Sequence, residues 1–216
     1  AQGSGTFGAQ LYWFDAAVDG NLITIGDSYT TPEITQTSSY WVAEVFVEQG
    51  SAGSGPLPTY CTPIFSSGCG LSDYIDDFIL EDNSGTTLIS HLGTGCSANA
   101  YEDFTGDASL SANLVANSTY NFEATHGPSS QYIRIWIDFD GNGDFEDDGE
   151  LVYESTSAGS TTVPTFGSFD IPQDIVTRNT VMRVKTTWST GASNSCTQSG
   201  SWGEAHDYKV TLIGAD

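Results

Sequence analysis

The chain has 216 residues and carries 28 acidic side chains against 5 basic ones, which gives a formal net charge of −23 at pH 7. So acidic a surface repels nucleic acids and anionic membranes, and neither is an expected partner. No apolar run reaches the roughly 18 residues that a membrane-spanning helix needs, so membrane insertion is not expected either. The length allows one large domain or two small ones.

Apolar stretches are short, alternate with polar residues and are separated by Gly, Pro, Asn and Asp. No helical periodicity is sustained, so the sequence predicts an all-β sandwich architecture. After a Gly-rich start, the chain predicts four short strands with turns between them: Leu11–Gly20, Leu22–Gly26, Ser28–Pro32 and Ser39–Val47.

These N-terminal stretches resemble the C-terminal part of an immunoglobulin-like (Ig-like) domain that is common in large bacterial surface proteins. The resemblance rests on Tyr12–Gly20, Gly26–Pro32 and Ser39–Ala43. The family has one or two further strands before the Trp13 strand, where this chain has only residues 1–10. We therefore expect residues 1–48 to form a truncated, partial Ig-like sandwich with a small core and open sheet edges.

Three ways to complete this partial sandwich remain open. A strand from a neighbouring copy could pair with the open edge, and because the two contact surfaces would differ, the contact would propagate head to tail into a filament. Residues 1–10 or the second domain could instead cover the edge within one chain. The sequence could also be a fragment of a longer multidomain protein.

Residues 49–58 read as a Gly/Ser/Pro linker that separates residues 1–48 from a second domain, residues 59–216. The second domain holds four cysteines, an even number that predicts two disulfides in a chain of secreted character: Cys61, Cys69, Cys96 and Cys196. Three pairings are open, and we favour a local Cys61–Cys69 clasp with a long Cys96–Cys196 connection. Zinc ligation is disfavoured because the spacing contains no C-x-x-C pair.

A strongly acidic loop lies between two predicted strands of the second domain. Ile133, Ile135 and Ile137 alternate along the first strand, and Leu151 and Val152 begin the second. The loop between them contains seven acidic residues from Asp138 to Glu150, with glycines at alternate positions of its first half. Closely spaced carboxylates repel one another unless a cation sits among them, and oxygen ligands at alternate positions suit calcium.

We assign the calcium ligands to Asp138, Asp140, Asn142 and Glu150, with Asp144 supplying a carbonyl or carboxylate oxygen. The loop is not an EF-hand, because its closing acid comes one residue late and its flanks read as strands. Asp148 is an additional candidate. The alternative is a solvated acidic hairpin loop without a metal.

From Tyr60 to Ile213 the chain resembles the GEVED domain of bacterial secreted and cell-surface proteins. The motifs that carry this resemblance are Tyr60-Cys61, Asp73–Leu80, Tyr101–Thr105, Trp136–Glu150, Val181–Val184 and Gly203–Tyr208. The chain departs from the family at Ala205 and His206, and it exchanges Asp140 and Asn142 in type. The resemblance implies a jelly-roll-like β-sandwich with an accessory, non-catalytic role.

Several other residues are candidates for binding or modification. Glu204 and Asp207 could supply oxygens to the same cation or support its ligands, or they could stabilise a turn through backbone amides. Asn117 begins an N-glycosylation sequon. Trp188 and Trp202 flank a polar loop, where they could stack on sugars or pack into the core.

These observations favour an extracellular or cell-surface protein that is not an enzyme, because no nucleophile motif or histidine spacing indicates catalysis. The first hypothesis is a calcium-stabilised subunit of a bacterial surface fibre or adhesin that assembles head to tail by β-strand complementation. The alternative is a carbohydrate- or surface-binding accessory module of a larger secreted protein.

Overall fold

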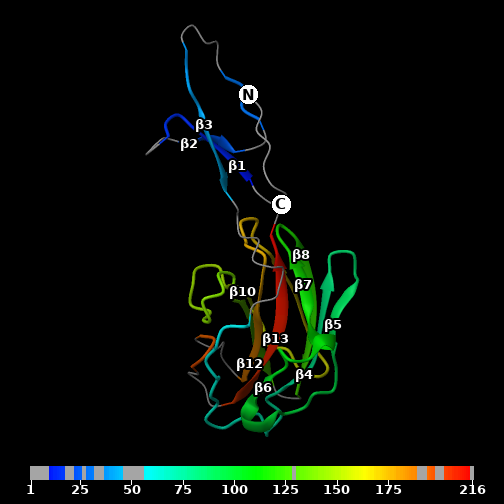
Figure 1. Cartoon of the computed structure of the whole chain (residues 1–216). Helices are drawn as coiled ribbons and strands as arrows, with labels where there is room; N and C mark the ends of the chain where they lie inside the picture. The colour runs from blue at the N-terminus through cyan, green and yellow to red at the C-terminus, as the bar shows by residue number, and fades with distance from the viewer. Residues whose placement is uncertain are drawn as a thin grey trace. The chain divides into compact units, whose positions relative to one another are not determined.

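The computed structural model describes residues 10–17, 22–25, 28–31, 37–45, 56–127, 130–188, 194–197 and 202–214. The chain divides into two compact units, residues 1–49 and residues 50–216 (Figure 1). Both units are built from β-strands, so the all-β prediction is confirmed. No helix in the described ranges is long and apolar enough to cross a membrane.

The N-terminal unit contains a three-stranded antiparallel sheet in the order β2-β1-β3. Its strands are β1 (Gln10–Phe14), β2 (Leu22–Ile25) and β3 (Trp41–Val45). Trp13 is buried and packs near Tyr29, whose ring lies 5.1 Å from that of Tyr40. The strand predicted over Ser28–Pro32 is wrong for residues 28–31, where only Ser28 forms a bridge. Of the turns predicted between these strands, those that fall on residues 18–21 and 32–36 lie outside the described residues.

The second unit is a sandwich of two sheets. One sheet has the order β10-β9-β12-β13-β6, with β7 also paired to β13, and the other has the order β11-β8-β4-β5. Strands β6 and β7 run parallel to β13, and the remaining pairs are antiparallel. The elements are β4 (Ile75–Asp82), β5 (Thr87–His91), η1 (Ala98–Ala100), β6 (Tyr101–Asp103), η2 (Ala108–Leu110), β7 (Ala112–Val115), β8 (Thr119–His126), β9 (Gln131–Ile137), β10 (Leu151–Glu154), β11 (Thr165–Asp170), β12 (Arg178–Trp188) and β13 (Gly203–Ile213).

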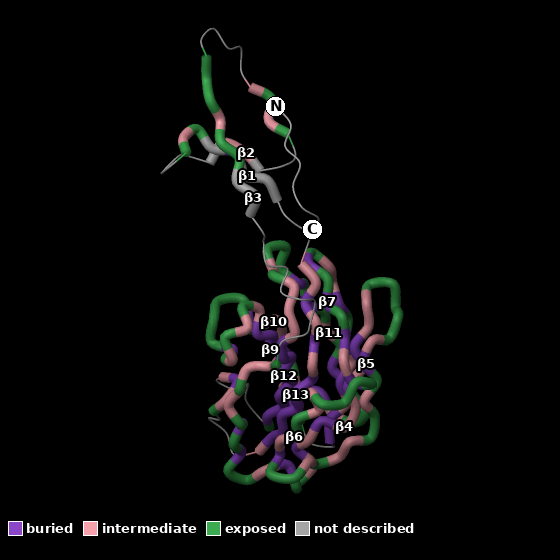
Figure 2. Tube along the Cα trace, viewed as in Figure 1, coloured by how far each residue is buried: buried purple, intermediate pink, exposed green. Residues whose placement is uncertain are grey.

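The main core lies between the two sheets (Figure 2). It forms because alternate residues along the strands are apolar, as in β9, where Ile133, Ile135 and Ile137 are all fully buried. Phe78 of β4 stacks on Tyr208 of β13 across this core, with ring centroids 5.3 Å apart. Each such buried side chain contributes about 1.5–3 kcal/mol relative to an exposed one.

Strand β12 is buried on both faces, which is unusual for a sandwich strand. Val181 and Arg183 lie on its outer face, and residues preceding β4 cover them. Lys185, further along the same face, donates to the carbonyl oxygens of Asn194 and Thr197 at 3.0 and 2.9 Å. An additional layer of chain therefore lies over the outside of this sheet.

Two disulfides connect this additional layer to the rest of the second unit. They join Cys61 to Cys196 and Cys69 to Cys96, so the favoured Cys61–Cys69 and Cys96–Cys196 pairing is wrong. The local clasp does not form because Cys69 packs with Phe65 in a small cluster beside β13, while Cys61 lies against Arg183.

The two disulfides should differ in their contributions to stability. They close chain separations of 135 and 27 residues. Because the loss of unfolded-state entropy grows with the logarithm of loop length, replacing Cys61 and Cys196 by alanine should cost about 1.4 kcal/mol more than replacing Cys69 and Cys96. Guanidinium unfolding of the two double variants measures this difference. Equal or reversed losses would contradict the loop-closure account.

Candidate functional site

The register of β9 and β10 brings the two ends of the acidic loop together. Trp136 pairs with Leu151, and the amide of Ile137 donates to the carbonyl oxygen of Glu150 at 2.9 Å. Asp138 immediately follows β9 and Glu150 immediately precedes β10, so both enter the same end of the loop. Both are buried, with Asp138 at 0% and Glu150 at 2% exposure.

Asp138 organises the first half of the loop. Its carboxylate accepts hydrogen bonds from the amides of Gly141 (2.5 Å) and Gly143 (3.0 Å) and from the hydroxyl of Tyr60 (2.7 Å). Gly141 and Gly143 have φ values of +73° and +94°, which favour glycine. A Cβ at Gly143 would also lie 3.0 Å from Pro58 Cβ, so these two positions admit no larger residue without a local shift.

Glu150 carries the clearest indication of a ligand. Its Oε1 accepts from the amide of Phe139 at 2.8 Å, but its Oε2 is buried without a hydrogen-bond partner. Burial raises the pKa of Glu150 to about 7, and the charges of Asp138 and Asp140 act in the same direction. A buried carboxylate oxygen without a partner costs free energy unless something satisfies it.

The loop carboxylates form two clusters that share Glu150. One consists of Asp138, Asp140 and Glu150, and the other consists of Asp144, Asp147 and Glu150; in each, one oxygen from every residue lies within 4.8 Å of the others. In the described part of the chain, no Lys, Arg or His nitrogen comes within 4.0 Å of any of them. Hard oxygen donors converging on an unsatisfied buried oxygen fit calcium.

The predicted ligands occupy different places in this arrangement. Asp138 and Asp140 lie with Glu150 in one cluster, and Asp144 lies with Glu150 and Asp147 in the other. Asp147 was not among the predicted ligands. The side chain of Asn142 accepts from the amide of Asp144 and donates to Asp147 at 2.7 Å. Asp148, the additional candidate, belongs to neither cluster.

Glu204 and Asp207 do not join the loop carboxylates. Glu204 is fully buried and accepts from the amides of Ser97 (2.6 Å) and Ile75 (2.9 Å), so it holds backbone amides, which was the other interpretation of this residue. Asp207 forms two hydrogen bonds with Arg183, Nε to Oδ1 at 2.7 Å and Nη2 to Oδ2 at 2.6 Å. Burial lowers the pKa of Arg183, but its hydrogen bonds and charge interaction with Asp207 outweigh this and raise it.

Among the residues that contact the loop from distant parts of the sequence are Tyr60 and Arg178. Tyr60 stacks on Phe145 at 5.1 Å while its hydroxyl reaches Asp138 and Thr180. Arg178 packs against Gly141, where its guanidinium would collide with an added Cβ. The sequence identifies Tyr60-Cys61 as part of a family motif but does not indicate its contact with the loop. Nothing in the local sequence indicates the contact of Arg178.

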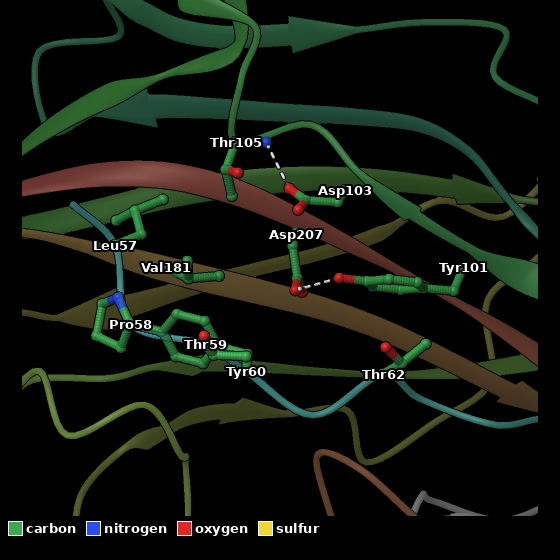
Figure 3. A pocket seen from close by; sticks show the side chains of 10 residues that line it. All are labelled: Leu57, Pro58, Thr59, Tyr60, Thr62, Tyr101, Asp103, Thr105, Val181 and Asp207. Carbon is green, nitrogen blue, oxygen red and sulfur yellow. Dashed lines mark hydrogen bonds between the residues drawn. The ribbon is translucent and has the colours of Figure 1, made fainter.

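A pocket of about 350 Å³ lies beside the loop on the outer face of the same sheet (Figure 3). Its floor is formed by Val181 of β12 and Asp207 of β13. Its walls come from the covering segment and from the region of β6: Leu57, Pro58, Thr59, Tyr60, Thr62, Tyr101, Asp103 and Thr105. The pocket is therefore lined by aromatic rings, hydroxyls and two carboxylates.

One group of residues has the composition of a catalytic triad. Ser97 Oγ lies 3.3 Å and Glu204 Oε2 lies 3.5 Å from Nε2 of His206. In a catalytic triad the nucleophile and the carboxylate contact opposite ring nitrogens. Here both contact Nε2, while Nδ1 faces the hydroxyl of Tyr208 at 3.3 Å. This cluster therefore lacks the geometry of a proton relay.

The remaining candidates lie at the surface to different degrees. Asn117 of the sequon is exposed in the turn before β8. Trp188 is half exposed and Trp202 is partly buried, so neither is a core residue. Much of the polar loop between these tryptophans lies outside the described residues.

Comparison with protein families finds one match in each part of the chain. Residues 132–211 match the GEVED domain, and residues 2–54 match the Ig-like domain described as CHU_C associated. Both resemblances are confirmed. Among curated proteins, none matches the chain. The Ig-like and GEVED families are typically non-catalytic and suggest an extracellular module, and two disulfides suggest a compartment outside the cytoplasm.

The Arg183–Asp207 pair should be costly to break from one side. Arg183→Met leaves the Asp207 carboxylate buried without its counter-charge, and we expect a loss of about 3–5 kcal/mol in the free energy of unfolding. The double variant Arg183→Met/Asp207→Leu should recover much of this loss because it removes both charges. Denaturant unfolding measures both variants. Equal instability would mean that packing, and not the buried charge, determines the loss.

Proposed function

We propose that this protein is a non-catalytic, extracellular structural subunit of a bacterial surface fibre or adhesin, stabilised by calcium. In this proposal its Ig-like domain assembles head to tail through β-strand complementation, and its GEVED domain provides a rigid body. The observation that carries the calcium step is the buried, unpaired Oε2 of Glu150. The assembly step is supported by the small N-terminal sheet with its two outer strands.

Calcium would neutralise a charge cluster that the protein itself leaves uncompensated. Asp138, Asp140 and Glu150 would hold the ion, and Asp144 and Asp147 would contribute oxygens or a second position. The ion would supply the positive charge that lets Glu150 ionise in a buried position. Because only the folded loop gathers these oxygens, binding would stabilise the folded state.

The same ion would also fix the end of the interdomain linker. Tyr60 donates to Asp138, and its ring stacks on Phe145. Leu57 packs in the same cluster, with Trp136 and Val181. Ordering the loop would therefore also order residues 57–60, where the predicted linker ends.

Calcium should raise the melting temperature in proportion to the logarithm of its concentration, by the equivalent of about 2.7 kcal/mol at a hundredfold excess over the dissociation constant. Glu150→Gln should abolish this gain. In chelator at pH 8, the same variant should be more stable than the wild type, because it removes an unpaired buried charge. Differential scanning calorimetry with and without calcium measures both effects.

Glu146→Gln is the matched control, since Glu146 is exposed in the same loop and belongs to neither carboxylate cluster. It should retain the calcium response. A wild-type melting temperature that is unchanged across millimolar calcium would overturn the calcium step and leave the assembly step standing.

The N-terminal sheet supports assembly through an added strand. Strand β1 is paired on both sides, but β2 and β3 each have one side without a partner strand in the described residues. Trp41 and Val42 of β3 are 40% and 47% exposed. An exposed, apolar edge strand offers backbone hydrogen bonds and side-chain contacts to a strand from another copy.

A lysine on this edge should block assembly. We expect the wild type to form polymers and Val42→Lys to remain monomeric, because a charged side chain on an edge strand opposes strand addition. Thr37→Lys adds the same charge at an exposed position outside β3 and should still polymerise. Mass photometry and negative-stain microscopy measure the outcome. A monomeric wild type at every concentration, or equal polymerisation of all three proteins, would contradict the proposal.

A further inference from the structure

The pocket beside β6 combines a rigid floor with unpaired polar groups at its rim. Its floor is held by Asp207, which is fixed by Arg183 from behind and by the Tyr101 hydroxyl at 2.8 Å. Tyr101 is held in turn, because Arg183 lies over its ring at 5.7 Å from the centroid. This part of the pocket is therefore formed before any ligand arrives.

The rim offers hydrogen-bonding groups that the described structure leaves available. Asp103 lies opposite Asp207 in the parallel β6–β13 pair, and only its Oδ1 is engaged, by the amide of Thr105 at 2.9 Å. The side-chain hydroxyls of Thr59, Thr62 and Thr105 likewise have no protein partner among the described residues. One acceptor oxygen and three hydroxyls thus surround the opening (Figure 3).

The charge of the pocket selects against anions. No basic residue lines it, because Arg183 is fully buried behind Asp207 and Tyr101. The charge of Asp207 is compensated by Arg183, but that of Asp103 is not, since no cation pairs with it among the described residues. In a chain of net charge −23, a phosphate, a sulfate or an acidic sugar would be repelled.

The apolar walls narrow the class of ligand further. The rings of Tyr60 and Tyr101 and the side chains of Leu57, Pro58 and Val181 supply apolar surface between the polar groups. A ligand that suits this lining has a compact ring with apolar patches and several hydroxyls around its edge. The volume is at the lower end for small-molecule sites, which limits the ligand to a small unit.

We propose that this pocket binds a single neutral pyranose unit of a glycan. Sugar hydroxyls donate to Asp103 and exchange hydrogen bonds with the rim threonines, while the ring contacts the tyrosines. This site is distinct from the calcium loop, because none of the loop carboxylates lines it. The proposal adds glycan attachment to the structural role and does not depend on fibre assembly.

Proton–nitrogen correlation NMR tests this proposal on the full chain, with the methyl glycosides of glucose, galactose, mannose and N-acetylglucosamine as probes. At least one should shift the amide signals of residues 101–105 with a dissociation constant of about 1 mM, as expected for so small a ligand. Glucuronic acid should bind at least about tenfold more weakly than the best neutral sugar, because Asp103 repels it.

Two variants of neighbouring acids on β6 separate a specific site from general surface effects. Asp103→Ala should weaken the best neutral sugar about tenfold, because it removes a charged acceptor. Glu102→Ala is the matched control, since Glu102 is exposed on the same strand but does not line the pocket, and it should leave affinity unchanged. An unchanged overall spectrum confirms that each variant is folded.

Three results would overturn the proposal. The first is the absence of shifts at residues 101–105 with every neutral sugar up to about 50 mM, well above the expected dissociation constant. The second is equal affinity for glucuronic acid. The third is binding that Asp103→Ala and Glu102→Ala weaken to the same extent, because that would place the sugar elsewhere on the acidic surface.

Discussion

The structure of the acidic loop depends on the register between β9 and β10. That register places Asp138 and Glu150, the first and last acids of the loop, together at one buried end of the loop. Two carboxylates brought together by strand pairing repel each other more strongly in a protein interior than in water. The ladder holds both ends of the loop, and burial together with the charge of Asp138 raises the pKa of Glu150.

The loop is continuous with the layer that covers the outer face of the larger sheet. Phe145 of the loop contacts both Tyr60 and the guanidinium of Arg183, the latter at 4.9 Å from the ring centroid. Arg183 in turn holds Asp207 and the carbonyl oxygen of Cys61. Through these contacts, the conformation of the loop affects the residues that follow the linker, and the same residues form one wall of the pocket.

The sequence predicted those features that depend on local pattern. Alternating apolar residues predicted the two strands that flank the acidic loop, β9 and β10, and the density of acids between them predicted the loop. Pairing of Cys61 with Cys69 was wrong because short separation is a weak guide when the intervening residues pack elsewhere, as Phe65 does beside β13. The contacts of Tyr60 and Arg178 with the loop depend on segments far apart in the chain, and no periodicity encodes them.

The roles of Glu204 and Asp207 could not be predicted from the sequence either. Both are acids near a predicted strand, and their composition alone does not distinguish a metal ligand from a structural anion. The structure distinguishes them by their partners: Glu204 accepts from backbone amides, and Asp207 is paired with Arg183. Neither has a buried oxygen without a partner among the described residues, whereas Glu150 does.

The difference between the unpaired Glu150 and the paired Glu204 and Asp207 gives a reason for the loop to bind an ion. The chain has only 5 basic residues, yet it places Arg183 against Asp207, where a permanent counter-charge is needed. It places Arg178 beside the loop at Gly141 without an ion pair to the loop carboxylates. A fixed basic side chain at Glu150 would satisfy the loop at all times and remove any dependence on the surroundings. Under the proposed calcium role, leaving that oxygen free would make the rigidity of the loop, and of residues 57–60 that contact it, depend on a cation from the medium.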